Sequence, residues 1–215
     1  MSEIDVLNNL IRRYPCLSPC TDDIKKAFEL LSNCFESGHK LLIAGNGGSS
    51  ADAEHIAGEL MKGFESQRLI DSELKTKLIN LDSKRGEKLA EKLQQGLPVI
   101  ALHNHQSLNT AFLNDVTNGA DLLFAQQVLV YGKTDDVLLC ISTSGNSENI
   151  VNAAVVARAK GLKTICLTGM NGGLLSKMCN ATIFAPASKT FEVQELHLPI
   201  YHCLCLMLEK HFFEK

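Results

Sequence analysis

Two short apolar runs in this chain each end in a loop of small residues that opens into a helical pattern. Lys40–Ala44 is followed by Gly45–Ser50, a loop of glycine, asparagine and serine. Asp136–Ile141 is followed by Ser142–Ser147, which consists of serine, threonine, glycine and asparagine. A repeated order of buried strand, small-residue loop and helix indicates an α/β fold built on a parallel sheet.

Both loops have the chemistry of an anion site. The first turn of a helix carries backbone N–H groups without helical partners, and the helix dipole adds positive charge there. Glycine lets a ligand approach the backbone closely, and serine and threonine hydroxyls donate further hydrogen bonds to phosphate oxygens. Two such loops in one domain predict the binding of a phosphorylated small molecule.

The rest of the hydrophobic pattern alternates between strands and helices. Strands are expected at 40–45, 97–102, 136–141, 163–168 and 181–185. Helices are expected within 1–38, where Thr21 or Asp22 would cap the second of them, and at 50–64, 106–114, 118–130, 147–160, 173–178 and 191–213. This order predicts a single α/β domain over residues 1–215, a three-layer αβα sandwich around a parallel five-stranded sheet. Ligands of such sheets lie beyond the carboxyl ends of the strands, where both loops fall.

The composition limits the expected partners and compartment. Of the 215 residues 21% are charged and the formal net charge is −3, so we expect no binding to nucleic acid. No apolar run reaches membrane-spanning length, and the acidic start Met1–Asp5 is unlike a signal peptide. We therefore expect a cytoplasmic protein that does not bind membranes. Its eight cysteines include no Cys-x-x-Cys pair and are interpreted as reduced thiols.

The segment at about 65–97 interrupts the alternation. It is dense in charges of both signs, and we expect an insertion with one solvated amphipathic helix, Lys84–Gln94, ended by Gly96. No chemistry is assigned to it, because a charge-rich helix face is usually solvated.

His55 and Glu59 stand four residues apart on the helix that follows the first loop, so their side chains lie on one face. Such a pair can ligate a divalent metal ion, work as an acid and a base, or form a simple contact on an exposed face. The spacing alone leaves these three interpretations open.

The terminal helix carries Gln194, His197 and His202 among apolar residues. Gln194 and His202 are eight residues apart, a rise of about 12 Å along a helix, and Pro199 between them removes a backbone donor. This is a long span for two ligands of one ion on one copy of the helix. A lone histidine in an apolar helix is usually a core or interface residue.

Two further polar groups stand near the ends of expected elements. His103–His105 ends a strand and is interpreted as structural or close to a substrate. Asn114 and Asp115 follow an apolar helical stretch and could lie at the rim of a cleft, although such pairs are also common in turns.

The order of these motifs resembles that of the sugar isomerase (SIS) domain superfamily, and within it the phosphoheptose isomerases. The resemblance covers the chain from residue 20 except the insertion. It is carried by the loop from Gly45, His55-x-x-x-Glu59, the loop Ser142–Ser147, Leu167-Thr168-Gly169 and Gln194-Glu195-x-His197. It implies a flavodoxin-like fold and a homotetramer with active sites at subunit interfaces. It also implies an aldose–ketose isomerase that interconverts D-sedoheptulose 7-phosphate and D-glycero-D-manno-heptose 7-phosphate.

The resemblance further implies roles for individual residues. The phosphate would be held by Ser142, Thr143, Ser144 and Ser147. The sugar would be contacted by Asn46, Gly47, Gly48, Glu59, Asn114, Asp115 and Gln194. Zn²⁺ is bound in relatives at the positions of His55, Glu59, Gln194 and His202. The proton-transfer residues match Glu59 and His202. If Gln194 and His202 serve one pocket, that pocket draws helices from more than one subunit, and a monomer would be inactive.

The chain departs from the family pattern in three places. Gly63 stands where an arginine is frequent, Phe191 stands where some relatives have an acidic residue, and the link at 65–97 is longer than usual.

The implied reaction moves a proton between C1 and C2 of an open-chain sugar phosphate through a cis-enediol. Glu59 would remove the carbon-bound proton, His202 would serve the oxygen or the opposite carbon, and Zn²⁺ would polarise the oxygens. Two other functions stay open: a non-catalytic tetrameric SIS protein that binds a replication initiator, and an isomerase of another phosphosugar. The set of His55, Glu59, Gln194 and His202 favours catalysis, since a scaffold has no chemical need for it.

Overall fold

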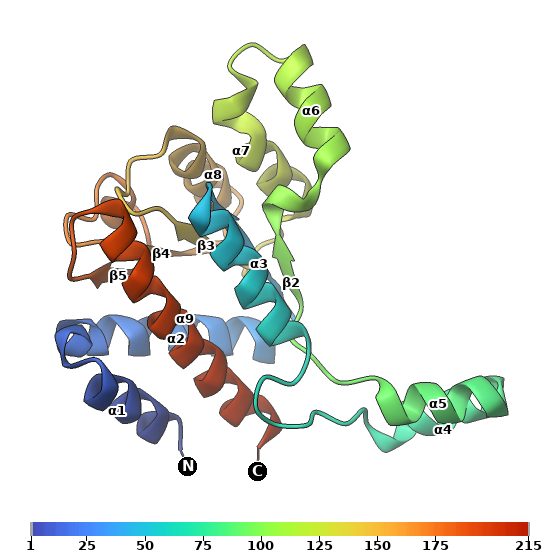
Figure 1. Ribbon diagram of the computed structural model, residues 1–215. Coiled ribbons are helices and arrows are strands. Elements are labelled where there is room, and N and C mark those ends of the chain that lie inside the picture. The colour runs from blue at the N-terminus through green and yellow to red at the C-terminus, as the bar shows by residue number, and fades with distance from the viewer. Residues whose placement is uncertain (1, 215) are drawn as a thin grey trace.

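The computed structural model describes residues 2–214 and confirms the predicted α/β architecture (Figure 1). The strands are β1 (Leu41–Gly45), β2 (Val99–Ala101), β3 (Val137–Ile141), β4 (Lys163–Gly169) and β5 (Ala181–Ala185). The α-helices are α1 (Glu3–Arg13), α2 (Thr21–Glu36), α3 (Gly48–Met61), α4 (Ser72–Leu81), α5 (Ser83–Lys92), α6 (Gln106–Asp115), α7 (Gly119–Tyr131), α8 (Glu148–Ala159) and α9 (Thr190–Phe213). Three short 3-10 helices are η1 (Pro15–Cys20), η2 (Leu102–Asn104) and η3 (Leu175–Lys177).

The five strands form one parallel sheet in the order β2-β1-β3-β4-β5, which is the flavodoxin-like order. From β1 the chain moves to β2 on one side, and from β3 it moves through β4 to β5 on the other. The loops after β1 and β3 therefore separate at the point where the winding reverses. Ligands of open α/β sheets bind at this point.

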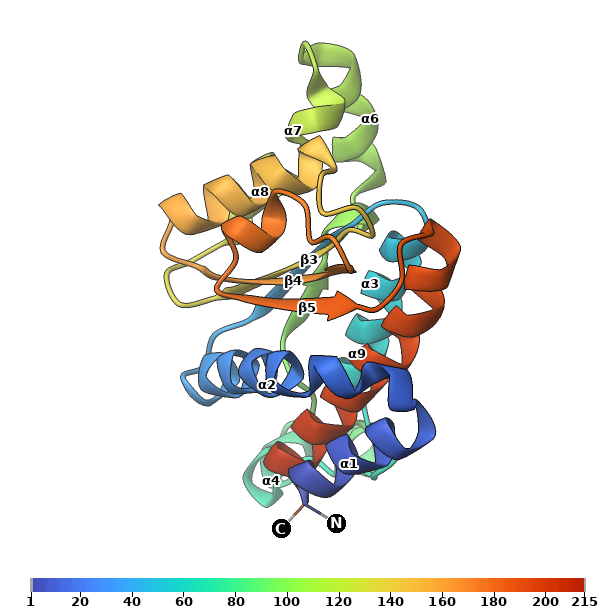
Figure 2. The ribbon, with the colours of Figure 1, turned by 90° about the vertical axis from the view of Figure 1, so that its left-hand side faces the viewer.

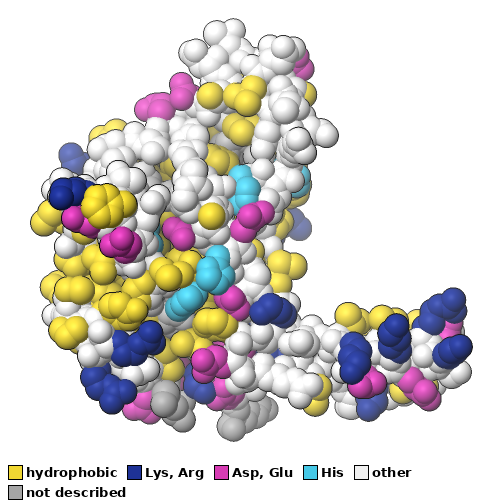
Figure 3. Space-filling view, in the orientation of Figure 1, with side chains coloured by type: hydrophobic (Ala, Val, Ile, Leu, Met, Phe, Trp, Pro, Cys, Tyr) yellow, Lys and Arg dark blue, Asp and Glu magenta, His cyan; other side chains and the backbone are white. Residues whose placement is uncertain are grey.

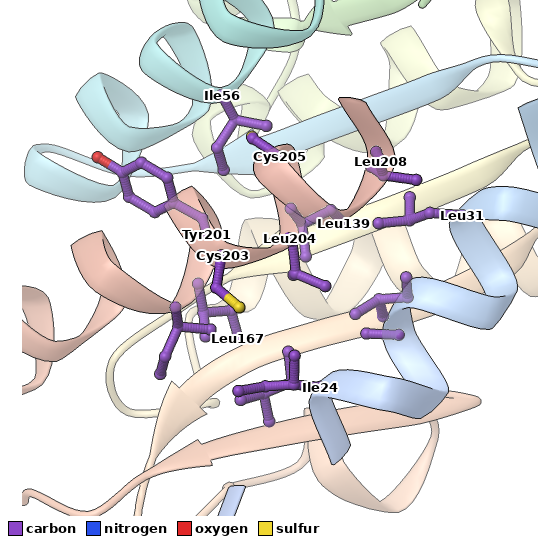
Figure 4. Packing of buried hydrophobic residues seen from close by; sticks show 14 of the residues in the cluster. Ile24, Leu31, Ile56, Leu139, Leu167, Tyr201, Cys203, Leu204, Cys205 and Leu208 are labelled. Carbon is purple, nitrogen blue, oxygen red and sulfur yellow. The ribbon is translucent and has the colours of Figure 1, made fainter. Parts of the chain in front are cut away.

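Helices cover both faces of the sheet (Figure 2). Successive strand residues point to opposite faces, so Leu41 packs on the side of α1, α2, α3 and α9, and Leu42 packs on the side of α7 and α8. Figure 4 shows Leu204 of α9 among Leu139 and Leu167 of the sheet. This burial fixes α9 beside α3, so side chains of the two helices can meet.

The insertion at 65–97 folds into two helices, α4 and α5, where one was expected. Each begins at an aspartate: the Asp71 side chain accepts a hydrogen bond from the N–H of Leu74, and that of Asp82 accepts one from Arg85. Asp82 breaks the helical path because its own backbone is extended. The pair projects from the body of the molecule (Figure 1), and α4 buries none of its residues.

Two other local predictions were wrong. Neither Thr21 nor Asp22 caps α2, because helical backbone continues from η1, and the Thr21 hydroxyl instead donates to the carbonyl of Ser18 at 2.7 Å. The helix expected at 173–178 is only the short η3, since Gly172 and Gly173 both take positive φ just before it.

All eight cysteines are free thiols, as predicted. In residues 2–214 there is no helix with the length and apolar character needed to cross a bilayer.

Candidate active site

A pocket of about 270 Å³ lies at the predicted place, between the loops after β1 and β3. It is lined by Asn46, Gly47, Gly48, Ser49, Ile141, Ser142, Thr143, Ser147, Thr190 and Gln194. The loops and the first turns of α3 and α9 thus meet around one hollow. The N-caps of α3 and α8 are Gly47 and Ser147, and neither makes a side-chain capping hydrogen bond in the described chain. Both helix starts therefore present donors that suit an anion.

Glycine is required where α3 begins. A Cβ on Gly48 would lie 2.6 Å from Nε2 of Gln194, so a larger residue there would push the end of the Gln194 side chain away from the loop. Gly47 has φ of 53°, a conformation that other residues rarely adopt. The first loop is shaped by these two positions.

Three of the four predicted phosphate-loop residues line the pocket. The hydroxyl oxygens of Ser142 and Ser147 lie 3.1 Å apart, and Thr143 lies between them along the loop. Ser144 does not line the pocket: it is exposed, and its Oγ accepts a hydrogen bond of 3.2 Å from the N–H of Asn146. The role of Ser144 as a phosphate ligand therefore stays a prediction, since the Oγ that accepts this bond can still donate its own proton.

A second cluster forms farther along α3. His55 Nε2 lies 3.2 Å from Glu59 Oε1 and 3.4 Å from His202 Nε2, and the phenol oxygen of Tyr201 lies 2.9 Å from His55 Nδ1. Lys62 Nζ lies 3.3 Å from the other oxygen of Glu59. The structure thus brings His202 to the pair of His55 and Glu59. The spacing of residues in the sequence could not predict this approach.

Burial shifts the pKa values of His202 and Tyr201. It lowers the pKa of His202, with His55 acting in the same direction, so His202 favours the neutral imidazole that can accept a proton. Burial and the neighbouring Asp52 carboxylate raise the pKa of Tyr201, which therefore remains a hydroxyl. With Tyr201 beside Nδ1, the Nε2 of His55 faces Glu59 and His202.

The same cluster fits a Zn²⁺ ion in its donor chemistry. Two imidazole nitrogens and a carboxylate oxygen are common zinc ligands, and neighbouring ligands of a tetrahedral zinc site lie about 3.3 Å apart. The distances from His55 Nε2 to Glu59 and to His202 match this spacing. Nevertheless, among residues 2–214 no group of three or more His, Cys, Asp or Glu side chains is placed to hold a metal ion. One chain supplies a partial set of donors.

Gln194 is not part of this cluster within one chain. It lies against Gly48 in the loop pocket, whereas Glu59 is eleven residues farther along α3, a rise of about 16 Å. The predicted zinc set of four residues is thus divided between two places. The reason is the length of α9, which separates Gln194 from His202.

Asn114 and Asp115 lie outside the pocket lining. They end α6, are exposed, and are joined by a hydrogen bond of 2.9 Å from Asn114 to Asp115. They lie on α6, which projects from the top of the molecule in Figure 1, and their contact with the sugar stays a prediction. His103 and His105 contact neighbouring side chains: they lie 3.1 Å from Glu54 Oε1 and 3.2 Å from the Tyr131 hydroxyl, respectively.

Four polar residues of the region were not predicted from the sequence. Ser49 and Thr190 line the pocket, Asn149 bonds to Asn46 across it, and Tyr201 contacts His55. Ser49 could have been found from its place in the first loop. The other three carry no local signal, since their partners are distant in the sequence.

The chain is similar to proteins of one family over most of its length. Residues 16–89 and 83–169 match the model described as the SIS domain. A phosphoheptose isomerase of Citrifermentans bemidjiense is 35% identical over 199 residues, which cover 93% of this chain and 88% of that protein. Another, from a Nitratiruptor species, is 39% identical over 173 residues and covers 80% and 78%. The solved structure of a phosphoheptose isomerase from Francisella tularensis has a TM-score of 0.74 and 30% identity, and covers 98% of this chain and 100% of that one.

Proposed function

The chain belongs to the SIS domain family, and we propose that it is an aldose–ketose isomerase that interconverts D-sedoheptulose 7-phosphate and D-glycero-D-manno-heptose 7-phosphate. The family supplies the reaction class, and relatives named phosphoheptose isomerase supply the substrate. The observation that carries the proposal is the presence of both halves of such a site. An anion pocket lined by hydroxyls and helix starts accompanies an acid–base cluster of Glu59, His55 and His202.

In the proposed mechanism the phosphate group binds in the loop pocket. The hydroxyls of Ser142, Thr143 and Ser147 and the starts of α3 and α8 donate hydrogen bonds to its oxygens. Glu59 removes the proton from C2 of the aldose, or from C1 of the ketose, and returns it to the other carbon. His202 moves a proton between the oxygens on C1 and C2, which gives a cis-enediol intermediate without net gain or loss of protons.

We propose further that Zn²⁺ is a cofactor. His55, Glu59 and His202 would hold it, and when bound it would polarise the carbonyl and hydroxyl oxygens of the sugar. Gln194 of the same chain lies at the loop pocket, so a glutamine ligand would come from a neighbouring subunit.

The enzyme is proposed to be a homotetramer that works in the cytoplasm. Figure 3 shows apolar side chains gathered beside the histidines, over α1 and α9. Leu198 is exposed there, and a hollow between the two helices contains His202, Leu10 and Leu206. A second copy of the chain that covers this face would complete the site. Eight free cysteines suit a reducing compartment.

The decisive experiment is to incubate the purified protein with sedoheptulose 7-phosphate and to follow aldose formation by NMR. Unphosphorylated sedoheptulose and ribulose 5-phosphate serve as comparison substrates. Conversion of the heptulose phosphate alone supports the proposal. If the protein isomerises only the pentose phosphate, or none of the three sugars, the assigned substrate is wrong.

A further inference from the structure

A buried ion pair joins the insertion to the terminal helix. Arg68 and Glu209 are 0% and 1% exposed at their side chains, and Arg68 Nε donates to Glu209 Oε1 at 2.9 Å. The Arg68 guanidinium also lies over the ring of Phe213, 4.4 Å from its centroid. The two charged residues are 141 positions apart, so this contact fixes segments that are distant in the chain.

The other nitrogens of Arg68 hold the end of α3. Nη1 donates to the carbonyl of Leu60 at 2.8 Å and Nη2 to the carbonyl of Glu59 at 3.2 Å. These carbonyls belong to the last turn of α3, where helical partners are absent. The residue that carries the proposed base thus has its own backbone bound by Arg68.

Glu209 holds the turn that leaves α3. Its Oε1 accepts a hydrogen bond from the N–H of Phe64 at 2.8 Å, and its Oε2 accepts those of Glu65 at 2.9 Å and Ser66 at 3.2 Å. Although burial opposes it, these hydrogen bonds and Arg68 keep the pKa of Glu209 below its usual range, so the carboxylate is ionised. A side chain on Gly63 would not fit this turn, since its Cβ would lie 2.2 Å from the carbonyl oxygen of Ser66.

The position of Glu209 on α9 links this contact to His202. The two are seven residues apart, which is about two helical turns, so they lie on the same face of α9. The pair therefore connects the backbone of Glu59 to the helix face that carries His202. A buried ion pair is a weak source of stability compared with apolar packing. Arg68 binds the Glu209 carboxylate and the carbonyls of Leu60 and Glu59 at the same time. This arrangement is better explained by a requirement to hold the end of α3 in a precise position. The planar guanidinium of arginine can make all these bonds, and the ammonium of lysine cannot.

We propose that Arg68 and Glu209 are positioning residues of the isomerase, which set the place of Glu59 relative to His202. This inference rests on the proposed function, because it concerns the same acid–base pair. Neither residue is expected to touch the substrate.

The test begins with Arg68→Lys, which keeps the charge but loses the fork. We expect kcat to fall about 10- to 100-fold, since small misplacements of reacting groups have effects of this size. KM for the sugar phosphate should stay nearly unchanged, because the loop pocket lies at the opposite end of α3. An unchanged kcat in Arg68→Lys would overturn the proposal.

A matched control is Asp136→Asn. Asp136 is also 1% exposed and pairs with Lys40 at 2.5 Å, but it precedes β3 and lies at the end of the sheet away from the pocket. This variant should lose stability while keeping kcat. The double variant R68M/E209Q leaves no unpaired charge, but it also removes the partner of the Glu59 and Leu60 carbonyls, so kcat should stay low. If kcat follows stability in all these variants, the pair is merely structural and the proposal fails.

A readout that needs no turnover separates this proposal from the proposed function. The ring signals of His55 and His202 in ¹⁵N-histidine NMR spectra should shift in Arg68→Lys and stay in place in Asp136→Asn. Should the wild-type protein not isomerise heptulose phosphate, the function is wrong, yet the ring signals still test the positioning. Identical ring signals in wild type and Arg68→Lys would refute the positioning role.

Discussion

Asn46 and Asn149 exchange two hydrogen bonds, each of 2.9 Å, between their side-chain amides. Asn46 belongs to the loop after β1, and Asn149 lies in the first turn of α8, just after the loop that follows β3. The pair therefore ties the two loops that form the pocket. A ligand held by both loops depends on their separation, which this pair sets.

Replacing Asn149 with alanine should weaken binding of the sugar phosphate. Loss of two side-chain hydrogen bonds, each contributing about 1 kcal/mol, predicts a rise in KM of about 5- to 30-fold with little change in kcat. Steady-state kinetics measure this directly. Asn152→Ala is the control on the same helix, since Asn152 donates to the carbonyl of Asp121 away from the pocket. Equal KM values in the two variants would contradict the role of Asn149.

Replacing Glu59 with glutamine should lower kcat by about two to four powers of ten, because the proposed base can no longer accept a proton. Phosphate binding should persist, since Glu59 is absent from the lining of the loop pocket. Calorimetric titration with substrate tests the binding. Glu54→Gln, on the exposed part of the same helix beside His103, should keep normal turnover. Near-normal kcat in Glu59→Gln would exclude Glu59 as the base.

Much of the fold and part of the geometry of the candidate site could be predicted from the sequence. Continuous apolar runs gave all five strands, and the loops that follow Ala44 and Ile141 do form the pocket. These predictions succeeded because a strand, its loop and the next helix are local features. Spacing also predicted that His55 and Glu59 share a helix face.

The failures concern contacts between distant segments. No local pattern shows that Gln194 packs on Gly48 or that Arg68 is buried against Glu209, because each contact depends on how α9 crosses α3. The insertion was predicted as one helix because charge density hid the break at Asp82.

Removal of metal should reduce turnover, and added Zn²⁺ should restore it. His55 and His202 supply nitrogen donors, and the Tyr201 hydroxyl orients His55. Tyr201→Phe should therefore lower metal affinity about 10- to 100-fold, as found for groups that orient metal ligands. Metal content by mass spectrometry and competition with a chelating dye measure this, with His103→Asn as the control. Full activity in verified metal-free protein would show that zinc is not needed.

Stability should fall as pH rises through the titration of His211. Hydrogen bonding to Glu36 and then to Glu3 raises the pKa of His211 above its ordinary value of 6.5, although burial opposes this. The folded state therefore gains stability below pH 6.5 that is lost as pH rises through the folded-state pKa. The ring joins α9 to α1 and α2, at 3.2 Å from Glu3 and 2.7 Å from Glu36. Urea unfolding across this range should show the decline, and His211→Gln should flatten it. An equal slope in that variant would assign the effect to other groups.

If the loop pocket of one subunit works with Glu59 of another, two inactive variants should rescue each other. Glu59→Gln keeps the loop but lacks the base. Ser147→Asp keeps the base, and aspartate still suits an N-cap, but its carboxylate repels the phosphate. A mixed oligomer contains some sites in which an intact loop faces an intact Glu59. We therefore expect co-expressed chains, purified through two different tags, to regain part of the wild-type turnover that neither variant has alone.

Monomeric variants such as Leu198→Glu should stay inactive, since Leu198 lies exposed on the apolar face of α9. Absence of rescue in a verified mixed oligomer would mean that each chain builds its site alone, and that the distance of about 16 Å along α3 is closed by movement within one subunit.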